Sequence, residues 1–357
     1  MLFINDIHIA PNRTGGTTAV TQAMLLEYVH EQFEKLLDIE TADGCVLIGG
    51  DLHDGFQIPN AALLRVYSAI CARLESGAIR TLFMSRGNHD LAKDTSKLSS
   101  FDLLGALLTD AYPQRVVVIV EPTLISWSEH ASDQGWVIPH APNNDIHDMW
   151  VEQVRNEPAP FVFLHCNFDN GMAAQSDHSL NITKEQCAGL EASGVKRIIF
   201  AHVHQQGTHP NGVLIVGNQF PCSVSDCLGN TYKRALQIDG GQISEVVTWQ
   251  DKGSYFEVDW AKLDLIPEDA QFVRIKGEAD DDQAAAVIEA ISTLRKKHSA
   301  FVISNAVVVN GRALDVSSIE AALQVDKFDV LEFLYSNLSA DQVEYLKNLN
   351  NLHKERV

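Results

Sequence analysis

Residues able to bind metal ions or carry protons stand at the ends of several apolar runs in this chain. One run, IRTLFM, leads into SRGNHDLAKD, which presents Asn88, His89 and Asp90 in consecutive positions after a glycine. A Gly-Asn pair by itself makes a turn, because both residues tolerate positive φ, but a turn needs neither the imidazole nor the carboxylate. Asp, His and Asn mixed without cysteine suit divalent ions such as Mn²⁺, Fe²⁺ or Zn²⁺, and oxygen ligands favour Mn²⁺.

Four further stretches repeat this pattern, and 12 of the 14 histidines precede residue 210. The stretches are FINDIH, LIGGDLHDG, FVFLHCNF and IIFAHVHQ, which contribute Asp6, His8, Asp51, His53, Asp54, His165, His202 and His204. Each alone has a structural explanation, such as a turn or a core histidine bonded to a carbonyl. Five in succession favour one shared site, because residues that follow the strands of an α/β sheet meet in a common crevice. Two ions held there could clamp the attacking and leaving oxygens of a phosphoryl displacement.

The elements that must position these residues alternate between strands and helices in the first half of the chain. Helical spacing of apolar residues predicts a helix over about 17–37, and a Thr-x-x-Gln capping box predicts another from Thr183. Later in the chain strands predominate. This order predicts an α/β core with two sheets packed face to face and helices outside. His202 and His204 alternate along the predicted strand RIIFAHVHQ, so their side chains are expected on one side of it.

The composition changes near residues 249–260, where WQDKGSYFEVDW separates two regions. We therefore expect a first domain over residues 1–250. The strand, helix and strand that follow predict a smaller α/β cap domain over 255–325. The remaining residues, 326–357, predict a helical tail with a capping box at Ser339. The apolar residues of this tail could enter a groove on a partner protein or pack on the cap domain.

The overall composition is that of an ordinary globular protein, with 357 residues, 45% of them hydrophobic and 21% charged. No run of ~18 apolar residues predicts a membrane span. The N-terminus shows no signal-peptide pattern and the six cysteines form no Cys-x-x-Cys pair, so a cytoplasmic location without disulfides is expected. The formal net charge of −20 argues against a free-standing nucleic-acid binder, although bound cations would offset part of it.

The order of the five motifs resembles the signature of the calcineurin-like metallophosphoesterases. Asp-x-His, Gly-Asp-x-x-Asp, Gly-Asn-His-Asp and a lone histidine are present, and Ala201 stands where the last motif, Gly-His-x-His, usually begins. The resemblance implies two metal ions that share Asp51. One would be held by Asp6, His8, Asp51 and His204, and the other by Asp51, Asn88, His165 and His202. It also implies that His89 faces the scissile phosphate as general acid or charge stabiliser, with Asp90 orienting its imidazole.

Within this superfamily the chain resembles the SbcD-type DNA nucleases of double-strand-break repair. The stretches that carry the resemblance are GDLHDGFQIPNAALLRVYSAICARL, RGNHDLAKDTSKLSSFDLLGALL and RALQIDGGQISEV, followed by a small cap domain. The resemblance implies an exo- or endonuclease that uses two divalent ions, Mn²⁺ first and Mg²⁺, Fe²⁺ or Zn²⁺ as alternatives. It also implies DNA as substrate, an SbcC-type coiled-coil ATPase bound through the tail, and a homodimer. His53 replaces a phenylalanine usual in this group, and it could contact the substrate phosphate or be a solvated turn residue.

Two other functions are consistent with the sequence. A phosphodiesterase or phosphatase for a small molecule or a phosphoprotein, with the cap as a specificity lid, is favoured by the acidic charge. A scaffold without catalysis is disfavoured, because all seven ligand positions and His89 are intact. The cap and the tail favour the nuclease.

Overall fold

The computed structural model describes residues 1–11, 18–91, 97–170, 180–210, 212–229, 231–310 and 312–313. The chain divides into two compact units. The first contains Met1–Glu257, Leu265–Arg274 and Arg295–Ser304, and the second contains Val258–Asp264, Ile275–Leu294 and the described residues from 305 onward. The domain boundaries expected at 250, 255 and 325 stay predictions. The helical tail expected over 326–357 lies outside the described residues.

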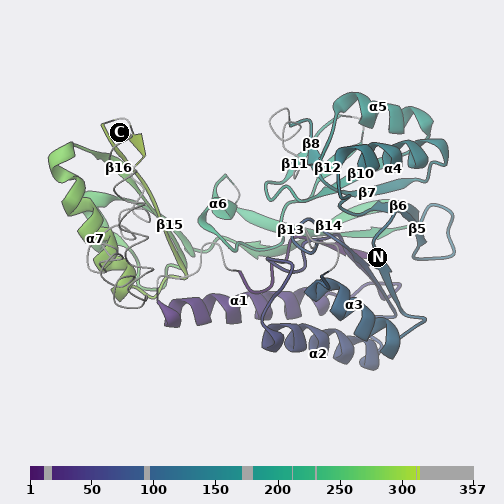
Figure 1. Ribbon diagram of the computed structural model, residues 1–357, viewed down its shortest axis with the longest axis horizontal. Helices are drawn as coiled ribbons and strands as arrows, with labels where there is room; N and C mark the ends of the chain where they lie inside the picture. Colours follow the sequence, from purple (N-terminus) through teal and green to yellow (C-terminus); the bar gives the residue numbers. More distant parts are fainter. Residues whose placement is uncertain are drawn as a thin grey trace, which may run out of the picture. The chain divides into compact units, whose positions relative to one another are not determined.

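The first sheet of unit 1 has six strands in the order β14-β13-β1-β2-β3-β4. Their bounds are β1 Leu2–Ile4, β2 Cys45–Ile48, β3 Thr81–Ser85, β4 Val116–Ile119, β13 Tyr232–Asp239 and β14 Gln242–Gln250. Strands β1 to β4 run parallel, and the hairpin β13–β14 adds antiparallel to β1. Three helices lie on the outer face of this sheet (Figure 1), α1 Ala19–Leu37, α2 Asn60–Ser76 and α3 Ser100–Ala111.

The second sheet of unit 1 also has six strands, in the order β11-β12-β10-β7-β6-β5. Their bounds are β5 Thr123–Ser126, β6 Gln134–Ile138, β7 Phe161–His165, β10 Arg197–Ala201, β11 Gly207–Thr208 and β12 Val213–Ile215. Helices α4 Asn144–Asn156 and α5 Lys184–Ser193 cover its outer face, as Figure 1 shows. The smaller elements are β8 Asn167–Phe168, β9 Asn181–Ile182 and α6 Val224–Cys227. Helix α4 and strand β5 were not predicted, although Trp150, Val151 and Val154 give α4 an apolar face.

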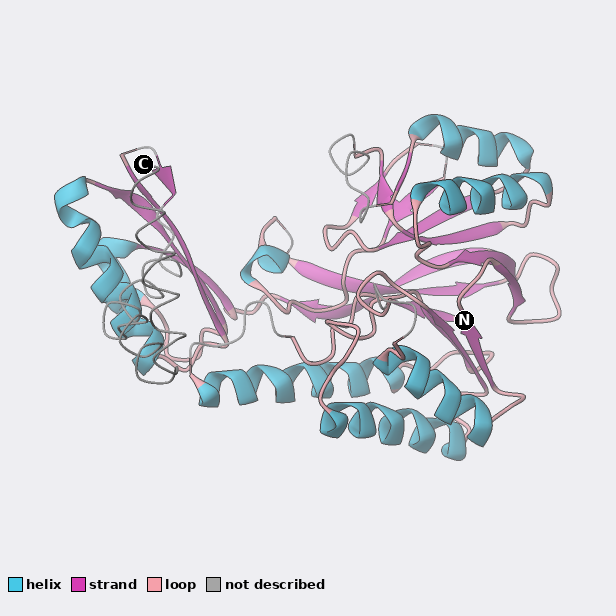
Figure 2. Ribbon diagram, in the orientation of Figure 1, coloured by secondary structure: helices cyan, strands magenta, loops and turns pink. Residues whose placement is uncertain are grey.

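Apolar side chains from both sheets form the layer between them. Phe3 on β1 stacks on Phe163 on β7 with 5.3 Å between ring centroids, and Trp127 packs edge-on against Phe161. Full burial of a phenylalanine contributes about 1.5–3 kcal/mol, so this layer holds the sheets face to face. The result is a helix–sheet–sheet–helix sandwich (Figure 2), which confirms the predicted fold class.

Local sequence signals fix the helix ends of this sandwich. The predicted capping box at the start of α5 is present: the Thr183 hydroxyl accepts from the Gln186 backbone N–H at 3.2 Å, and the Gln186 side chain accepts from the Thr183 backbone N–H at 2.9 Å. Thr18 and Ser99 cap α1 and α3 in the same way. Such caps contribute about 1 kcal/mol each and set where the loops of the site end.

A third sheet follows residue 255, with the order β15-β16-β17-β18. Its elements are β15 Tyr255–Asp259, β16 Phe272–Ala279, β17 Val302–Val309 and β18 Arg312–Ala313, with the helix α7 Ala284–Lys297 and the 3₁₀ helices η2 Trp260–Leu265 and η3 Asp281–Gln283. The predicted strand, helix and strand are therefore present. In the described parts of the chain, no helix is long and apolar enough to cross a membrane. All six cysteines are buried, and none is in a disulfide.

Candidate metal centre

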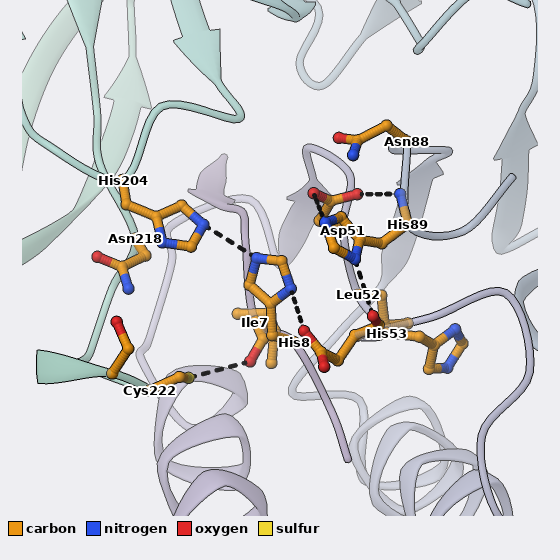
Figure 3. A network of polar contacts seen from close by, with 12 residues as sticks. Ile7, His8, Asp51, Leu52, His53, Asn88, His89, His204, Asn218 and Cys222 are labelled. Atoms are coloured by element: carbon orange, nitrogen blue, oxygen red, sulfur yellow. Dashed lines mark hydrogen bonds and ion pairs between the residues drawn. The ribbon is translucent and has the colours of Figure 1, made fainter. Parts of the chain in front are cut away.

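The predicted site residues follow the carboxyl ends of five strands, β1, β2, β3, β7 and β10. Strands β1, β2 and β3 are parallel neighbours in one sheet, and β7 and β10 are parallel neighbours in the other. The topology therefore brings the five loops to one edge of the sandwich. Figure 3 shows residues from four of these loops, with the rings of His8 and His204 turned toward each other and His89 beside Asp51.

One group of potential ligands contains Asp6, His8 and His204, whose donor atoms lie within 4.8 Å of one another. The Nε2 atoms of His8 and His204 face each other at 3.0 Å (Figure 3). Two nitrogens bound to a common ion at ~2.1 Å and at right angles lie about this far apart. The opposite nitrogen of each ring contacts a carboxylate: Asp54 Oδ1 is 3.3 Å from His8 Nδ1, and Asp226 Oδ1 accepts from His204 Nδ1 at 2.8 Å.

A second group contains Asp51, His165 and His202, again within 4.8 Å. Asn88 belongs to it, because its Oδ1 is 3.1 Å from His165 Nε2 and 2.9 Å from His202 Nδ1. Asp51 Oδ2 lies 3.3 Å from His165 Nε2. Asp51 is also grouped with His8 and His89. It stands between the two ligand groups, where a bridging carboxylate would be needed.

The backbone of these loops adopts conformations that side chains rarely take. Asp6, His8, Asp51 and His202 all have positive φ, between 49° and 75°. Residues held in this region cost of order 1–3 kcal/mol each and are typical of functional sites. Strand β10 ends at Ala201, so the prediction that His202 and His204 alternate along one strand is wrong. The left-handed turn at His202 instead directs the two rings into different ligand groups.

Two glycines allow the loops to approach closely. A Cβ at Gly87 would lie 2.2 Å from Asp51 N and Oδ1, and a Cβ at Gly50 would lie 2.3 Å from His165 Nδ1. The His8 backbone N–H also donates to the Asp51 carbonyl at 3.1 Å. These contacts cross-link the loops after β1, β2, β3 and β7, and the ligands are held before any ion arrives.

The electrostatics of the site favour bound cations. Burial lowers the pKa of His8, but the carboxylates of Asp54, Asp51 and Asp6 outweigh it and raise the pKa to about 9. Burial also lowers the pKa of His165, but the neighbouring carboxylate of Asp51 outweighs burial and raises this pKa to about 9. Asp6 Oδ1 is buried without a hydrogen-bond partner among the described residues. A buried carboxylate oxygen without a partner, next to several imidazoles, is a set of ligands that suits divalent ions.

His89 lies beside both groups. Its backbone N–H donates to Asp51 Oδ1 at 2.8 Å, and its Nδ1 is 2.8 Å from the Asp54 carbonyl oxygen. A carbonyl oxygen can only accept a hydrogen bond, so Nδ1 of His89 carries the proton. Nε2 lies on the side of Asp51, 4.0 Å from its Oδ2. The His89 ring is also edge-on to His8, with 4.9 Å between centroids.

The predicted role of Asp90 differs from its contacts. Its carboxylate accepts the backbone N–H groups of Gly87, Leu52 and His53 at 3.0–3.2 Å. Asp90 Oδ1 also lies 3.3 Å from His53 Nδ1. The carboxylate therefore ties the loop after β3 to the loop after β2, and the contact that orients the His89 ring comes from the backbone of Asp54 instead.

One of the two interpretations offered for His53 is wrong: its side chain has no exposed surface, so it is not a solvated turn residue. The contact with the substrate phosphate stays a prediction. In Figure 3 its ring points away from the metal-binding residues. Both ring nitrogens are buried without a hydrogen bond among the described residues, although Nδ1 lies 3.3 Å from Asp90 Oδ1.

Two residues near the site were missed. Asp226 contacts His204 and is only 2% exposed, and nothing in PCSVSDCLGN beyond its Ser-x-x-Asp capping pattern marks it. His140 lies beside His165 with 6.2 Å between ring centroids. Burial lowers the pKa of His140 to about 3, so its ring is neutral. A signal was present, because His140 follows the apolar strand WVIP in the way the predicted ligands follow theirs.

Comparison with known proteins places this site in a family. The model of the calcineurin-like phosphoesterases matches residues 1–206, which include all seven predicted ligands and His89. A search of curated proteins found no match. The matched segment is more than half of the 357 residues and covers both ligand groups. The chain belongs to the calcineurin-like phosphoesterase family and is a metal-dependent phosphoester hydrolase.

Proposed function

We propose that the chain is a two-metal DNA nuclease of the SbcD type, which hydrolyses phosphodiester bonds during recombination or repair. The observation that carries the proposal is that the residues of a phosphoesterase site are followed by the elements that follow it in SbcD-type nucleases. Hairpin β13–β14, the RALQIDGGQISEV segment, extends the first sheet, and a further α/β region follows it. The resemblance of the loops after β2 and β3 to those nucleases supports the same substrate.

The residues present support two-metal hydrolysis. When bound, two divalent ions would activate a water and neutralise charge on the phosphate. Asp6, His8, Asp51 and His204 would hold one ion, and Asp51, Asn88, His165 and His202 the other. The mixture of carboxylate, amide and imidazole ligands favours Mn²⁺, with Mg²⁺, Fe²⁺ and Zn²⁺ as alternatives.

His89 is suited to hold a proton at the reacting phosphate. The Asp54 carbonyl fixes its ring by accepting from Nδ1, so Nε2 is the nitrogen that would act toward substrate. A positioned imidazole of this kind gives or receives the proton of a leaving or attacking oxygen. Asp90 supports it indirectly, by anchoring the turn at Gly87.

The partner is part of the proposal. The net charge of −20 is unfavourable for gripping DNA alone, because phosphate binding needs a basic surface. An SbcC-type ATPase bound through residues 326–357 would supply that surface. A homodimer is the expected arrangement of the nuclease chains.

The acidic charge favours one alternative, a phosphodiesterase or phosphatase acting on a small molecule or a phosphoprotein. Such substrates need no extended basic surface. The two functions share the metal site and differ in what reaches it.

A nuclease assay of purified protein in Mn²⁺ separates these functions. Labelled duplex and single-stranded DNA and bis-p-nitrophenyl phosphate are tested in parallel, with His89→Ala as the blank. Cleavage of DNA that disappears in the blank supports the nuclease. Hydrolysis of the small diester with intact DNA, unchanged after an SbcC-type ATPase is added, would favour the alternative.

A further inference from the structure

The two ligand groups differ in what stands behind their histidines. In the group of Asp6, His8 and His204, each imidazole contacts a carboxylate through the nitrogen that faces away from the ion position. In the other group the backing atoms are neutral. His165 Nδ1 is 3.0 Å from the Gly49 carbonyl oxygen, and His202 Nε2 is 3.2 Å from Asn167 Nδ2.

The carboxylate behind His204 is firmly held. Asp226 Oδ1 accepts from His204 Nδ1 at 2.8 Å. Its Oδ2 accepts the backbone N–H groups of Cys222 and Ser223 and the Ser223 hydroxyl, all at 2.9 Å. With both oxygens occupied by donors, Asp226 can only accept from His204, so it places the proton on Nδ1 and leaves Nε2 bare as a ligand.

The same segment also holds the backbone of His204. Lys233, 1% exposed, donates from Nζ to the His204 carbonyl oxygen at 3.2 Å. Its ammonium group offsets the charge of Asp226 in a buried place, where a lone carboxylate would be costly. Cys222 adds a contact from Sγ to the Ile7 carbonyl at 3.8 Å, between Asp6 and His8 (Figure 3). Cys222, Asp226 and Lys233 thus contact both loops that supply this ligand group.

Charge further separates the two groups. The first can draw on Asp6 and the shared Asp51, with Asp54 and Asp226 behind its histidines. The second has Asp51 and the neutral amide of Asn88. Carboxylates behind ligating histidines raise the basicity of the ligand, and their removal typically costs 10–100-fold in metal affinity.

We propose that Asp226 is a positioning residue for His204, and that it makes the Asp6–His8–His204 group the tighter of two unequal cation sites. The inference concerns cation binding and does not depend on which phosphoester is cleaved.

Mn²⁺ titration of the full chain, followed by calorimetry and by the electron paramagnetic resonance signal of free Mn²⁺, tests the proposal. Two affinity classes are expected for the unsubstituted protein. Asp226→Asn should weaken the tighter class about 10–100-fold and leave the weaker class unchanged. An amide has one oxygen that accepts and one NH₂ group that donates, so it cannot accept both from His204 and from the backbone N–H groups of Cys222 and Ser223 as Asp226 does. Asp226→Glu, which keeps the charge, should recover part of the loss.

Asp133→Asn is the matched control. Asp133 is also fully buried and accepts a hydroxyl and two backbone N–H groups, but from Ser128, Gly240 and Gly241, far along the strands from the site. It should leave both affinity classes unchanged. Imidazole NMR of the metal-free protein adds a readout that a merely structural role would not move: the Nδ1–H signal of His204 should be present and should be lost in Asp226→Asn.

Each remaining outcome is decisive. Unchanged Mn²⁺ affinity in a folded Asp226→Asn variant, or a loss confined to the weaker class, would overturn the proposal. If Asp226→Asn does not fold, as judged by circular dichroism, Asp226→Glu and the NMR signal of the unsubstituted protein decide instead, and a His204 protonated on Nε2 refutes it. No Mn²⁺ binding by the unsubstituted protein would overturn the metal-centre assignment itself.

Discussion

Two fully enclosed carboxylates, Asp51 and Asp133, lie at opposite ends of the strands of unit 1. Asp133 precedes β6 and accepts from Ser128 Oγ at 2.7 Å and from the backbone N–H groups of Gly241 and Gly240 at 2.8 and 3.2 Å. Asp51 follows β2 and accepts one backbone N–H, from His89, while the imidazoles of His8, His89 and His165 surround it. The donors to Asp133 are a hydroxyl and backbone N–H groups, which cannot bind an ion, whereas most groups around Asp51 are imidazoles, which can. Asp133 therefore stabilises the fold, and Asp51 lies in the candidate metal centre.

Removing Asp51 should give the largest effect on function. Because it is shared by both ligand groups, Asp51→Ala should abolish binding of both ions and reduce hydrolysis by roughly 10⁴-fold or more. Metal content by atomic emission and turnover of bis-p-nitrophenyl phosphate measure the two losses. Retention of one tightly bound ion would show that Asp51 does not bridge, and the contrast with Asp133 would then disappear.

His89→Ala should separate chemistry from metal binding. The ring lies beside the ligands, and its described polar contacts are with Asp51 and the Asp54 carbonyl. Turnover should fall about 10²–10⁴-fold while Mn²⁺ affinity stays near that of the unsubstituted protein. Paired titration and kinetics check this. An equal loss of metal would assign His89 to the ligands instead.

Metal binding should release protons and strengthen as the pH rises. His8 and His165, with a pKa of about 9 in the metal-free fold, are protonated at pH 7 and must lose those protons to bind an ion. The affinity should rise up to about tenfold per proton for each pH unit and level off above pH 9. Calorimetry in two buffers of different ionisation enthalpy counts the protons. A pH-independent affinity would contradict the charged state assigned to these rings.

The raised pKa values of His8 and His165 should make the metal-free fold less stable as the pH rises, whereas metal affinity increases. Each raised pKa stabilises the folded state fully below the ordinary value of 6.5, and this contribution is lost as the pH rises through about 9. Metal-free protein should therefore melt at a lower temperature at pH 9.5 than at pH 6. Saturating Mn²⁺ should reverse the order, because the ion replaces the protons.

Asp133→Ala should give the smallest effect on function and a clear effect on stability. It leaves the Gly240 and Gly241 N–H groups without their acceptor, at a cost of about 2–3 kcal/mol in the free energy of unfolding. Hydrogen bonds hold the pKa of Asp133 below its ordinary value despite burial, so its contribution is present above pH 3.8 and lost as the pH falls through the folded-state pKa. Urea unfolding at pH 7 and at pH 3 measures both. A loss of Mn²⁺ affinity here would remove the distinction from Asp51.

Much of the fold and the ligand groups could be predicted, because motifs at strand ends carry both kinds of information. The apolar runs predicted the two sheets, and the strand topology then required Asp51 and His165 to meet. The contacts of His53 and Asp90 could not be predicted, since they depend on how the loop after β2 packs against the loop after β3. Asp226 was out of reach for the same reason: its partner His204 lies 22 residues away, and no local pattern links them.

The buried cysteines give this chain an internal set of reporters. Burial raises the pKa of the Cys166 and Cys222 thiols well above the usual range, so little reactive thiolate exists in the folded state. Alkylation must then wait for a local opening, and its rate gives the free energy of that opening. Cys166 follows His165 directly, and Cys222 contacts Ile7 between two ligands. Their labelling rates with and without Mn²⁺ would measure how much a bound ion raises the free energy of local opening of the loops around each site.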